Sequence, residues 1–233
     1  MIPKYKDAGI PIITHSLGEI SDDPTIIGGV NSVAQYQASA RLIANWFIAD
    51  SGGQGSALLQ RVDGFPVLKS WADTFAEEVK SNCPGCKVTD LSNTIAQAQA
   101  NAIVPTITAA LSRQPETGYV ISADLEFLDA LPSALNAAGR QIKVAGDDPG
   151  DTTIQSAMKQ GGIDAASSRP NRTLSWLMAD MVFRHELGLP MLSGEDLVAP
   201  IRLLTPDADF EVSPSHDFPA DYEEQFKSLW NIG

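Results

Sequence analysis

The sequence predicts an α/β fold built on a mostly parallel β-sheet that helices cover. Short apolar runs alternate with segments of helical periodicity along most of the 233 residues, which is the pattern of βαβ units. The connections are short and rich in Gly, Pro, Asn and Asp, as tight turns require. The chain has no internal repeat and no low-complexity segment. Its length allows one large domain or two small ones.

Strands and helices are expected in regular order along the first half of the chain. The apolar residues are contiguous in the expected strands and recur at helical spacing in the expected helices. The strands are expected at 10–16, 56–62 and 86–91, and the helices at 35–50, 66–81 and 96–113. Asn31 and Ser32 are candidate caps, and Pro66 suits a first helical turn. Pro105 is expected to kink or split its helix.

The same alternation continues through the second half. Strands are expected at 118–123, 141–146 and 164–168, and helices at 125–138, 152–160 and 172–187. Residues 196–204 are expected to be extended, and 220–230 to form a closing amphipathic helix. At the other end, residues 4–9 resemble the tail of a helix directly before a strand. The pattern therefore predicts that the chain starts within a βαβ unit.

Charge excludes one large class of functions. The formal net charge is −13 at pH 7, and Lys and Arg are spread singly along the chain from Lys4 to Lys227. Such a surface repels nucleic acid and anionic lipid, so no nucleic-acid partner is expected. No apolar run is long enough to span a bilayer, and residues 1–16 lack the apolar core of a signal peptide. Either the protein is cytosolic or its targeting segment is not in this chain.

Polar side chains follow the carboxyl ends of several expected strands, where ligands of open α/β sheets bind. These candidate ligand-binding residues are His15, Ser16, Asp124, Asp148, Ser168 and Arg169, and Asp147 shares the position of Asp148. Asp124 and Asp148 are equally well placed to cap the helices that follow them. Both interpretations remain open at this stage.

One aromatic residue is a further candidate for ligand contact. Phe65 lies in a strand-to-helix loop at the same edge, next to Pro66. An exposed ring there would stack on a sugar or another flat ligand, and the alternative is a hydrophobic staple that packs back on the helix. The four tryptophans lie on expected helices, where packing in the core is the default interpretation.

Signatures of catalysis and of metal binding are scarce. The sequence contains no G-x-S-x-G elbow, no G-x-G-x-x-G, no P-loop and no H-E-x-x-H. The three histidines are far apart in the sequence, with no ligand-like spacing to a carboxylate. No catalytic residue, metal or cofactor is therefore expected.

The order of the segments resembles that of the type I periplasmic binding proteins, the ribose- and galactose-binding family. Segments that carry the resemblance are "KDAGIPIITHS", "SALLQRVDG", "YVISADLEFLDALPSALNAAG", "KVAGDDPGD", "AASSRPNRTLSWLMADMV" and "IRLLTPDADF". No single motif is highly specific, but their order and spacing cover nearly the whole chain. The resemblance therefore rests on the order of the segments along the chain, and not on any one motif.

The resemblance implies two lobes of parallel sheet flanked by helices, joined by a hinge and closing on a small-molecule ligand. By analogy, residues 1–26 and 169–233 form an incomplete first lobe, and residues 27–168 form the second. In the family, a first βαβαβ portion and a signal sequence precede the point where this chain starts. The family catalyses no reaction, delivers its ligand to the permease of an ABC importer, and works in the periplasm or outside the cell.

The family's ligand-binding positions are only partly kept. Its Asp after the first expected strand falls near Ser16, its second-lobe Arg near Trp71, and its crossover Gln on Ser168. Two aspartates are kept, as Asp124 and Asp148. The lost groups bind sugar hydroxyls in the family, so the substitutions argue against a simple aldose. They favour a larger or flatter ligand that contacts Trp71 and Phe65.

Two other classes of function compete with a solute-binding protein of an importer. The ligand-sensing domain of a lac-repressor-like regulator has the same fold, but its DNA-binding helix-turn-helix is absent from this sequence. A thiol–disulfide oxidoreductase would use Cys83 and Cys86, the only cysteines, in "NCPGCK". That motif follows an expected helix, whereas reactive C-x-x-C thiols lie at a helix N-terminus. A disulfide staple, which favours an oxidising compartment, is the preferred interpretation.

Overall fold

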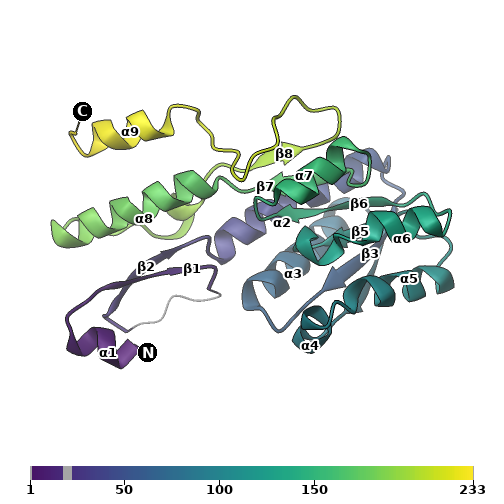
Figure 1. Cartoon of the computed structure of the whole chain (residues 1–233), viewed down its shortest axis with the longest axis horizontal. Coiled ribbons are helices and arrows are strands. Elements are labelled where there is room, and N and C mark those ends of the chain that lie inside the picture. The colour runs from purple at the N-terminus through teal and green to yellow at the C-terminus, as the bar shows by residue number, and fades with distance from the viewer. Residues whose placement is uncertain (1, 18–22, 233) are drawn as a thin grey trace.

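The computed structural model describes residues 2–17 and 23–232, which form two sheets with flanking helices (Figure 1). The larger sheet has the strand order β4-β3-β5-β6-β7-β8, and the smaller one pairs β1 with β2. All pairings are parallel except β7 with β8. The α/β fold with a mostly parallel sheet is thus confirmed. The strands are β1 (Ile12–His15), β2 (Ile26–Val30), β3 (Ser56–Arg61), β4 (Lys87–Ser92), β5 (Tyr119–Ser122), β6 (Lys143–Asp148), β7 (Ala165–Ser168) and β8 (Arg202–Leu204).

The helices lie close to their expected positions. They are α1 (Ile2–Asp7), α2 (Val33–Asp50), α3 (Pro66–Asn82), α4 (Ile95–Gln99), α5 (Ile103–Arg113), α6 (Leu131–Ala137), α7 (Thr152–Lys159), α8 (Asn171–Glu186) and α9 (Tyr222–Leu229), with 3₁₀ turns η1 (Leu125–Leu128) and η2 (Gly194–Leu197). Pro66 is in the first turn of α3, as expected. Ser32 is the N-cap of α2, but its side chain makes no capping hydrogen bond.

The inner strands of the larger sheet are buried on both faces. Leu59 and Ile121 face a core shared with α2 and α3, whereas the neighbouring Leu58 and Val120 face a second core with α5, α6 and α7. Since successive side chains of a strand point to opposite faces, a strand that is buried on both sides must be apolar throughout. This explains why the strands of this sheet appear in the sequence as contiguous apolar runs.

The smaller sheet has a core of its own. Val30 of β2 packs against α8 in a cluster that contains Leu174, Leu177 and Met181. Helix α9 packs on α8 through stacked rings of Trp176 and Trp230, whose centroids are 5.2 Å apart. In Figure 1 these elements lie to one side of the six-stranded sheet, with α8 beside β2. The chain therefore contains two packed bodies.

Strand β2 was not expected from the sequence. Its "IIGGV" contains two glycines, which weaken a strand on propensity alone. The packing explains one of them, because a Cβ on Gly28 would lie 1.9 Å from Met181 Cε of α8. The expected buried strand at 10–16 is also shorter, and its residues are only partly buried. Packing against α8 therefore explains where β1 and β2 form.

Two of the expected helices are each divided in two. In each case a proline, Pro105 or Pro132, lies in the first turn of the helix that follows the break. The segment expected at 96–113 breaks between Gln99 and Ile103, so Pro105 falls at the start of α5, where its missing N–H is harmless. Pro132 likewise lies in the first turn of α6, after the separate 3₁₀ turn η1. The region expected to be extended at 196–204 begins within η2 and becomes β8 only at Arg202.

The expected boundaries of the lobes stay a prediction. The strand pairing joins β2 to β1 and joins β8 to β7. Residues 26–30 thus belong to the smaller sheet, and residues 202–204 belong to the larger one. Between β2 and β8, the backbone passes more than once from one sheet to the other.

Cys83 and Cys86 are joined as a disulfide at the corner between α3 and β4. Cys83 is the C-cap of α3 and is buried in the core, so the helix dipole does not activate its thiol. This geometry does not support the oxidoreductase interpretation.

Removing the disulfide with the double substitution Cys83→Ala/Cys86→Ala is expected to lower the free energy of unfolding by about 2 kcal/mol. This magnitude follows from the entropy of closing so short a loop. Chemical denaturation measures the change. A thiol assay on the unfolded, unreduced protein should find no free thiol, and two reactive thiols would show that the bond does not form.

Candidate functional site

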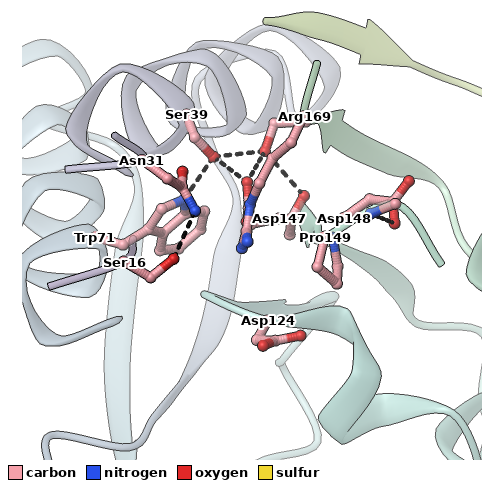
Figure 2. A network of polar contacts seen from close by, with 12 residues as sticks. Ser16, Asn31, Ser39, Trp71, Asp124, Asp147, Asp148, Pro149 and Arg169 are labelled. Carbon is pink, nitrogen blue, oxygen red and sulfur yellow. Dashed lines mark hydrogen bonds and ion pairs between the residues drawn. The ribbon is translucent and has the colours of Figure 1, made fainter. Parts of the chain in front are cut away.

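The candidate site lies where the carboxyl ends of strands from both sheets meet. His15 ends β1, Ser16 follows it and Asn31 follows β2, whereas Asp124 follows β5 and Arg169 follows β7. Figure 2 shows Ser16 and Asn31 on one side of this region and Asp124 on the other, with the guanidinium of Arg169 between them. The structure therefore brings together residues that the sequence places more than 100 positions apart.

Arg169 is held in place by a buried carboxylate. Its Nε donates to Asp147 Oδ2 at 2.7 Å, and its Nη2 donates to the same oxygen. Arg169 is 8% exposed, and Asp147 is fully buried. Burial alone would lower the pKa of Arg169, but the charge and hydrogen bonds of Asp147 together with the charges of Tyr36 and Asp124 outweigh it, and the net shift is upward. Within the described part of the chain, Nη1 has no hydrogen-bond partner, so this nitrogen is free to donate to a ligand.

A chain of buried hydroxyl groups holds Asp147 in turn. Ser39 of α2 donates to Asp147 Oδ1 at 2.6 Å, and Ser167 of β7 donates to the same oxygen at 2.9 Å. Trp71 Nε1 donates to Ser39 Oγ at 2.8 Å. These bonds satisfy a fully buried carboxylate and fix the orientation of Arg169.

The prediction that Trp71 offers its ring to a ligand is wrong. Trp71 is fully buried between α2 and α3, stacks on Phe75 with centroids 5.7 Å apart, and uses its only polar group on Ser39. A ring with no accessible surface has none to offer a flat ligand. Trp71 instead supports the hydrogen-bonded chain that leads to Arg169.

Asp148 and Ser168 also lie inside the protein. Both are fully buried, and Ser168 Oγ donates to Asp148 Oδ2 at 3.4 Å. Asp148 Oδ1 accepts the backbone N–H groups of Gly150 and Asp151 at 2.8 Å each and so holds the loop before α7, whose N-cap is Asp151. Burial is the main cause that raises the pKa of Asp148. Internal hydrogen bonding thus fits these two residues better than direct ligand contact, and the helix cap expected at Asp148 is instead Asp151.

Asp124 remains open to a ligand. Its Oδ1 accepts the N–H of Glu126 at 3.0 Å and caps η1, whereas Oδ2 has no protein partner among the described residues. Burial raises the pKa of Asp124 to about 7, against the opposing effect of the positive charge of Arg169. A partly desolvated carboxyl group beside an Arg with a free N–H offers one acceptor and one donor to the same ligand.

The smaller sheet contributes a second polar group. Asn31 Nδ2 donates to Ser16 Oγ at 2.8 Å, and Ser16 Oγ lies 2.8 Å from His15 Nδ1. Both Ser16 (φ 56°) and Asn31 (φ 52°) have left-handed backbone, which is uncommon outside glycine. Asn31 Oδ1 is buried without a partner in the described ranges. Burial, followed by the charge of Arg169, lowers the pKa of His15, so this ring is neutral at pH 7.

One aromatic ring lies against Arg169, and another follows the carboxyl end of β3. Tyr36 of α2 is 4% exposed, and Arg169 Cζ lies 4.7 Å from the centroid of its ring. Phe65, the N-cap of α3, is 38% exposed, as expected for a residue at the edge of a site. Phe65 is therefore the predicted aromatic residue that keeps a surface for ligand contact.

Sequence reasoning missed Ser39, Asn31 and Tyr36, and did not select Asp147. The signal for Asp147 was present, because it ends the same strand as Asp148. Ser39 and Tyr36 lie on the buried face of α2 among Ala40, Ile43 and Phe47. A polar residue on an apolar helix face is a recognisable signal, although it does not reveal its partner.

The surface also has a concave region away from the candidate site. A polar depression lies at the opposite, amino ends of β5 and β6, where Tyr119, Arg140 and Lys143 are among its lining residues. In the described residues, no three His, Cys, Asp or Glu side chains are grouped so that they could hold a metal ion. No helix in residues 2–17 and 23–232 has both the length and the apolar character to cross a bilayer.

Comparison with solved structures supports the fold. An ABC sugar transporter subunit from Rhodobacter sphaeroides is 23% identical, with a TM-score of 0.70 over 89% of this chain and 73% of that one. A solute-binding protein from Agrobacterium vitis with bound D-fucose is 16% identical (TM-score 0.71, 87% and 68%). The arabinose-binding component from Shewanella sp. ANA-3, bound to L-arabinofuranose, is 16% identical (TM-score 0.70, 97% and 71%).

Comparison of the sequence itself identifies the family. No curated protein matches the chain significantly. The family model described as "Periplasmic binding protein domain" matches residues 1–189. This match covers most of the chain, including both sheets except β8 and every residue of the candidate site. The chain therefore belongs to the periplasmic binding protein domain family.

Proposed function

We propose that this protein is the sugar-binding subunit of an ABC importer and binds a small sugar or sugar-like ligand between its two sheets. The observation that carries the proposal is the nearness of Asp124 to Arg169 at the converging strand ends, where the charge of each shifts the pKa of the other (Figure 2). Asp124 Oδ2 accepts, and Arg169 Nη1 donates, within one partly desolvated site. A sugar hydroxyl both donates and accepts, so adjacent hydroxyls satisfy this pair.

The remaining groups would complete the recognition of a polar ligand with one apolar face. Ser16 and His15 face the ligand from the smaller sheet, and Phe65 supplies a ring for the C–H face of a sugar. The solved relatives that bind D-fucose and L-arabinofuranose make both pyranoses and furanoses reasonable candidates. With Trp71 buried, the argument for a large flat ligand loses its main support.

The wider assignment follows from the family and is part of the same proposal. The two bodies correspond to two lobes: the six-stranded sheet with its helices is the second lobe, and β2, which pairs with β1, stays with the first. The partner of the loaded protein is the permease of the importer. The place of action is the periplasm or the outer cell surface, where the Cys83–Cys86 disulfide would persist.

A sugar panel tests the proposed function. Thermal denaturation with millimolar D-fucose, D-allose, L-arabinose, D-galactose and D-ribose is expected to raise the melting temperature with at least one sugar, because a ligand selective for the folded state stabilises it. The substitution Asp124→Ala should abolish that shift. A panel in which no sugar and no related polyol changes the melting temperature would contradict the proposal.

The affinity for the sugar is expected to depend on pH through Asp124. Its pKa is raised to about 7 by burial, so the carboxylate that accepts sugar hydroxyls forms only as the pH rises through 7. Binding should weaken about tenfold per pH unit below that value and level off above it. Isothermal titration between pH 5 and 9 measures this profile. A flat profile would show that the ionised form of Asp124 is not required.

A further inference from the structure

The two bodies are connected by four stretches of backbone. Residues 31–32 lead from β2 into α2, and residues 169–170 lead from β7 into α8. Two further stretches return later in the chain, 198–201 between η2 and β8, and 205–221 between β8 and α9. Since the candidate site lies between the bodies, these four crossings control how far apart its two halves stand.

A buried glutamine of α2 holds the third crossing. Gln35 Nε2 donates to the carbonyl of Ala199 at 3.1 Å, and Ala199 N donates back to Gln35 Oε1 at 2.7 Å. Gln35 is 1% exposed. Its amide thus pairs with both backbone groups of Ala199, in the manner of a neighbouring strand. Ala199 itself packs in the core of the smaller sheet.

A second buried glutamine holds the fourth crossing in the same way. Gln155 Nε2 donates to the carbonyl of Ser213 at 2.8 Å, and Ser213 N donates back to Gln155 Oε1 at 2.8 Å. Gln155 is fully buried and also donates to Asp148 Oδ2 at 2.8 Å. His216 Nε2 lies 3.1 Å from Gln155 Oε1. Asp148 thus orients the amide that holds this crossing.

The fourth crossing also reaches the other body. Ser215 Oγ accepts the N–H of Arg172, and Asp217 Oδ1 accepts the N–H of Thr173 at 2.8 Å. These bonds cap the first turn of α8, for which the N-cap residue Pro170 offers no side-chain bond. Residues 213–217 are therefore tied to α7 of the larger sheet and to α8 of the smaller one at the same time.

We propose that Gln35 and Gln155 are positioning residues that fix the two returning crossings and so set the separation of the two halves of the ligand site. With these crossings held, relative motion of the bodies is concentrated at residues 31–32 and 169–170. The link to ligand binding rests on the proposed function, but the mechanical role does not. Neither glutamine touches the candidate ligand groups Asp124 and Arg169.

Distance measurement on the ligand-free protein tests the inference. Spin labels on Glu186→Cys in α8 and Arg113→Cys in α5 report the separation of the bodies by pulsed electron paramagnetic resonance, with the native disulfide left intact. The substitutions Gln35→Met and Gln155→Met keep side-chain length and remove both hydrogen bonds. Each is expected to broaden the distance distribution about twofold relative to the unsubstituted chain.

Gln60 provides the matched control. It is also 1% exposed, but among the described residues its amide bonds only to Asn93 and Ser122, within the six-stranded sheet body. Gln60→Met should therefore leave the distribution unchanged, although it removes as many buried hydrogen bonds as Gln35→Met; Gln155→Met also removes those to Asp148 and His216. An equal broadening in Gln60→Met, or no broadening in Gln35→Met and Gln155→Met, would overturn the inference.

Hydrogen exchange on the unsubstituted protein gives a test that needs no variant to fold. The amides of Ala199 and Ser213 lie outside helices and strands, yet each donates to a buried glutamine. Both are expected to exchange at least about 100-fold more slowly than in an unfolded chain. Unprotected exchange at both amides would overturn the inference. Neither measurement uses a sugar, so failure of the proposed function leaves their outcomes unchanged.

Discussion

Replacing Asp124 with Asn is expected to stabilise the ligand-free protein at pH 8 while weakening its binding of sugar. The native carboxyl group has a pKa of about 7 because it is buried, against about 3.9 for an exposed Asp. At pH 8 the folded state must hold this group ionised in a poorly solvated site. Relief of that penalty corresponds to at most about 4 kcal/mol, or several degrees in melting temperature.

The stabilisation by Asp124→Asn is expected to increase with pH. Because the folded-state pKa lies above the unfolded one, the penalty is absent below about pH 4, grows as the pH rises and is complete above about pH 7. The stabilisation by Asp124→Asn should therefore vanish in acid and reach its maximum above neutrality. Melting temperatures of both proteins from pH 4 to pH 9 measure the difference.

A matched control separates this effect from a general change in charge. Asp209 is exposed, and its side chain has no ion pair within the described residues. Asp209→Asn removes the same charge, so its melting temperature should follow the unsubstituted protein at every pH. If Asp124→Asn melts at or below that temperature at pH 8, the carboxyl group is not under strain. Its assignment to ligand binding would then lose its main physical support.

Replacing Asp147 with Asn is expected to lower the free energy of unfolding by about 3–5 kcal/mol. The substitution leaves the guanidinium of Arg169, which is 8% exposed, without its carboxylate. An uncompensated buried charge has an effect of this size. Chemical denaturation at pH 7 measures the loss, and sugar binding should fall with it because Arg169 is no longer oriented.

The double substitution Asp147→Asn/Arg169→Met shows whether the loss comes from the unpaired charge. With no buried cation left, most of the stability should return, whereas sugar binding should not. An exposed pair supplies the control, because Lys87 and Glu116 are both solvent-accessible and lie 3.2 Å apart. Glu116→Gln should change stability by less than about 1 kcal/mol. A loss for Asp147→Asn no larger than this would show that the buried pair contributes little.

Much of the larger sheet could be predicted from sequence because local pattern and tertiary packing agree there. Strands buried on both faces, such as β3 and β5, appear as contiguous apolar runs with turn residues at their ends. β2 was not predictable in this way. Its glycines are unfavourable locally, and Gly28 is required only because Met181 of α8 approaches so closely. The reason for this glycine is a contact between two segments that are far apart in the sequence, which the local pattern does not reveal.

The candidate site was predictable only in part, for a related reason. The rule that ligands bind at strand carboxyl ends selected Ser16, Asp124 and Arg169, which the structure brings together (Figure 2), and His15, which contacts Ser16. The same rule selected Asp148 and Ser168, because position along a strand does not determine which side chains turn inward. Trp71 was assigned by analogy with a family position, and its burial against Ser39 depends on the packing of α2 on α3.

The most direct test of the account is to map a bound sugar onto the protein by ¹H–¹⁵N nuclear magnetic resonance. Titration of the first stabilising sugar of the panel is expected to produce its largest shift changes at Ser16, Phe65, Asp124 and Arg169, where strands of both sheets end. Changes concentrated at Tyr119, Arg140 and Lys143, around the depression at the opposite ends of the strands, would contradict the account.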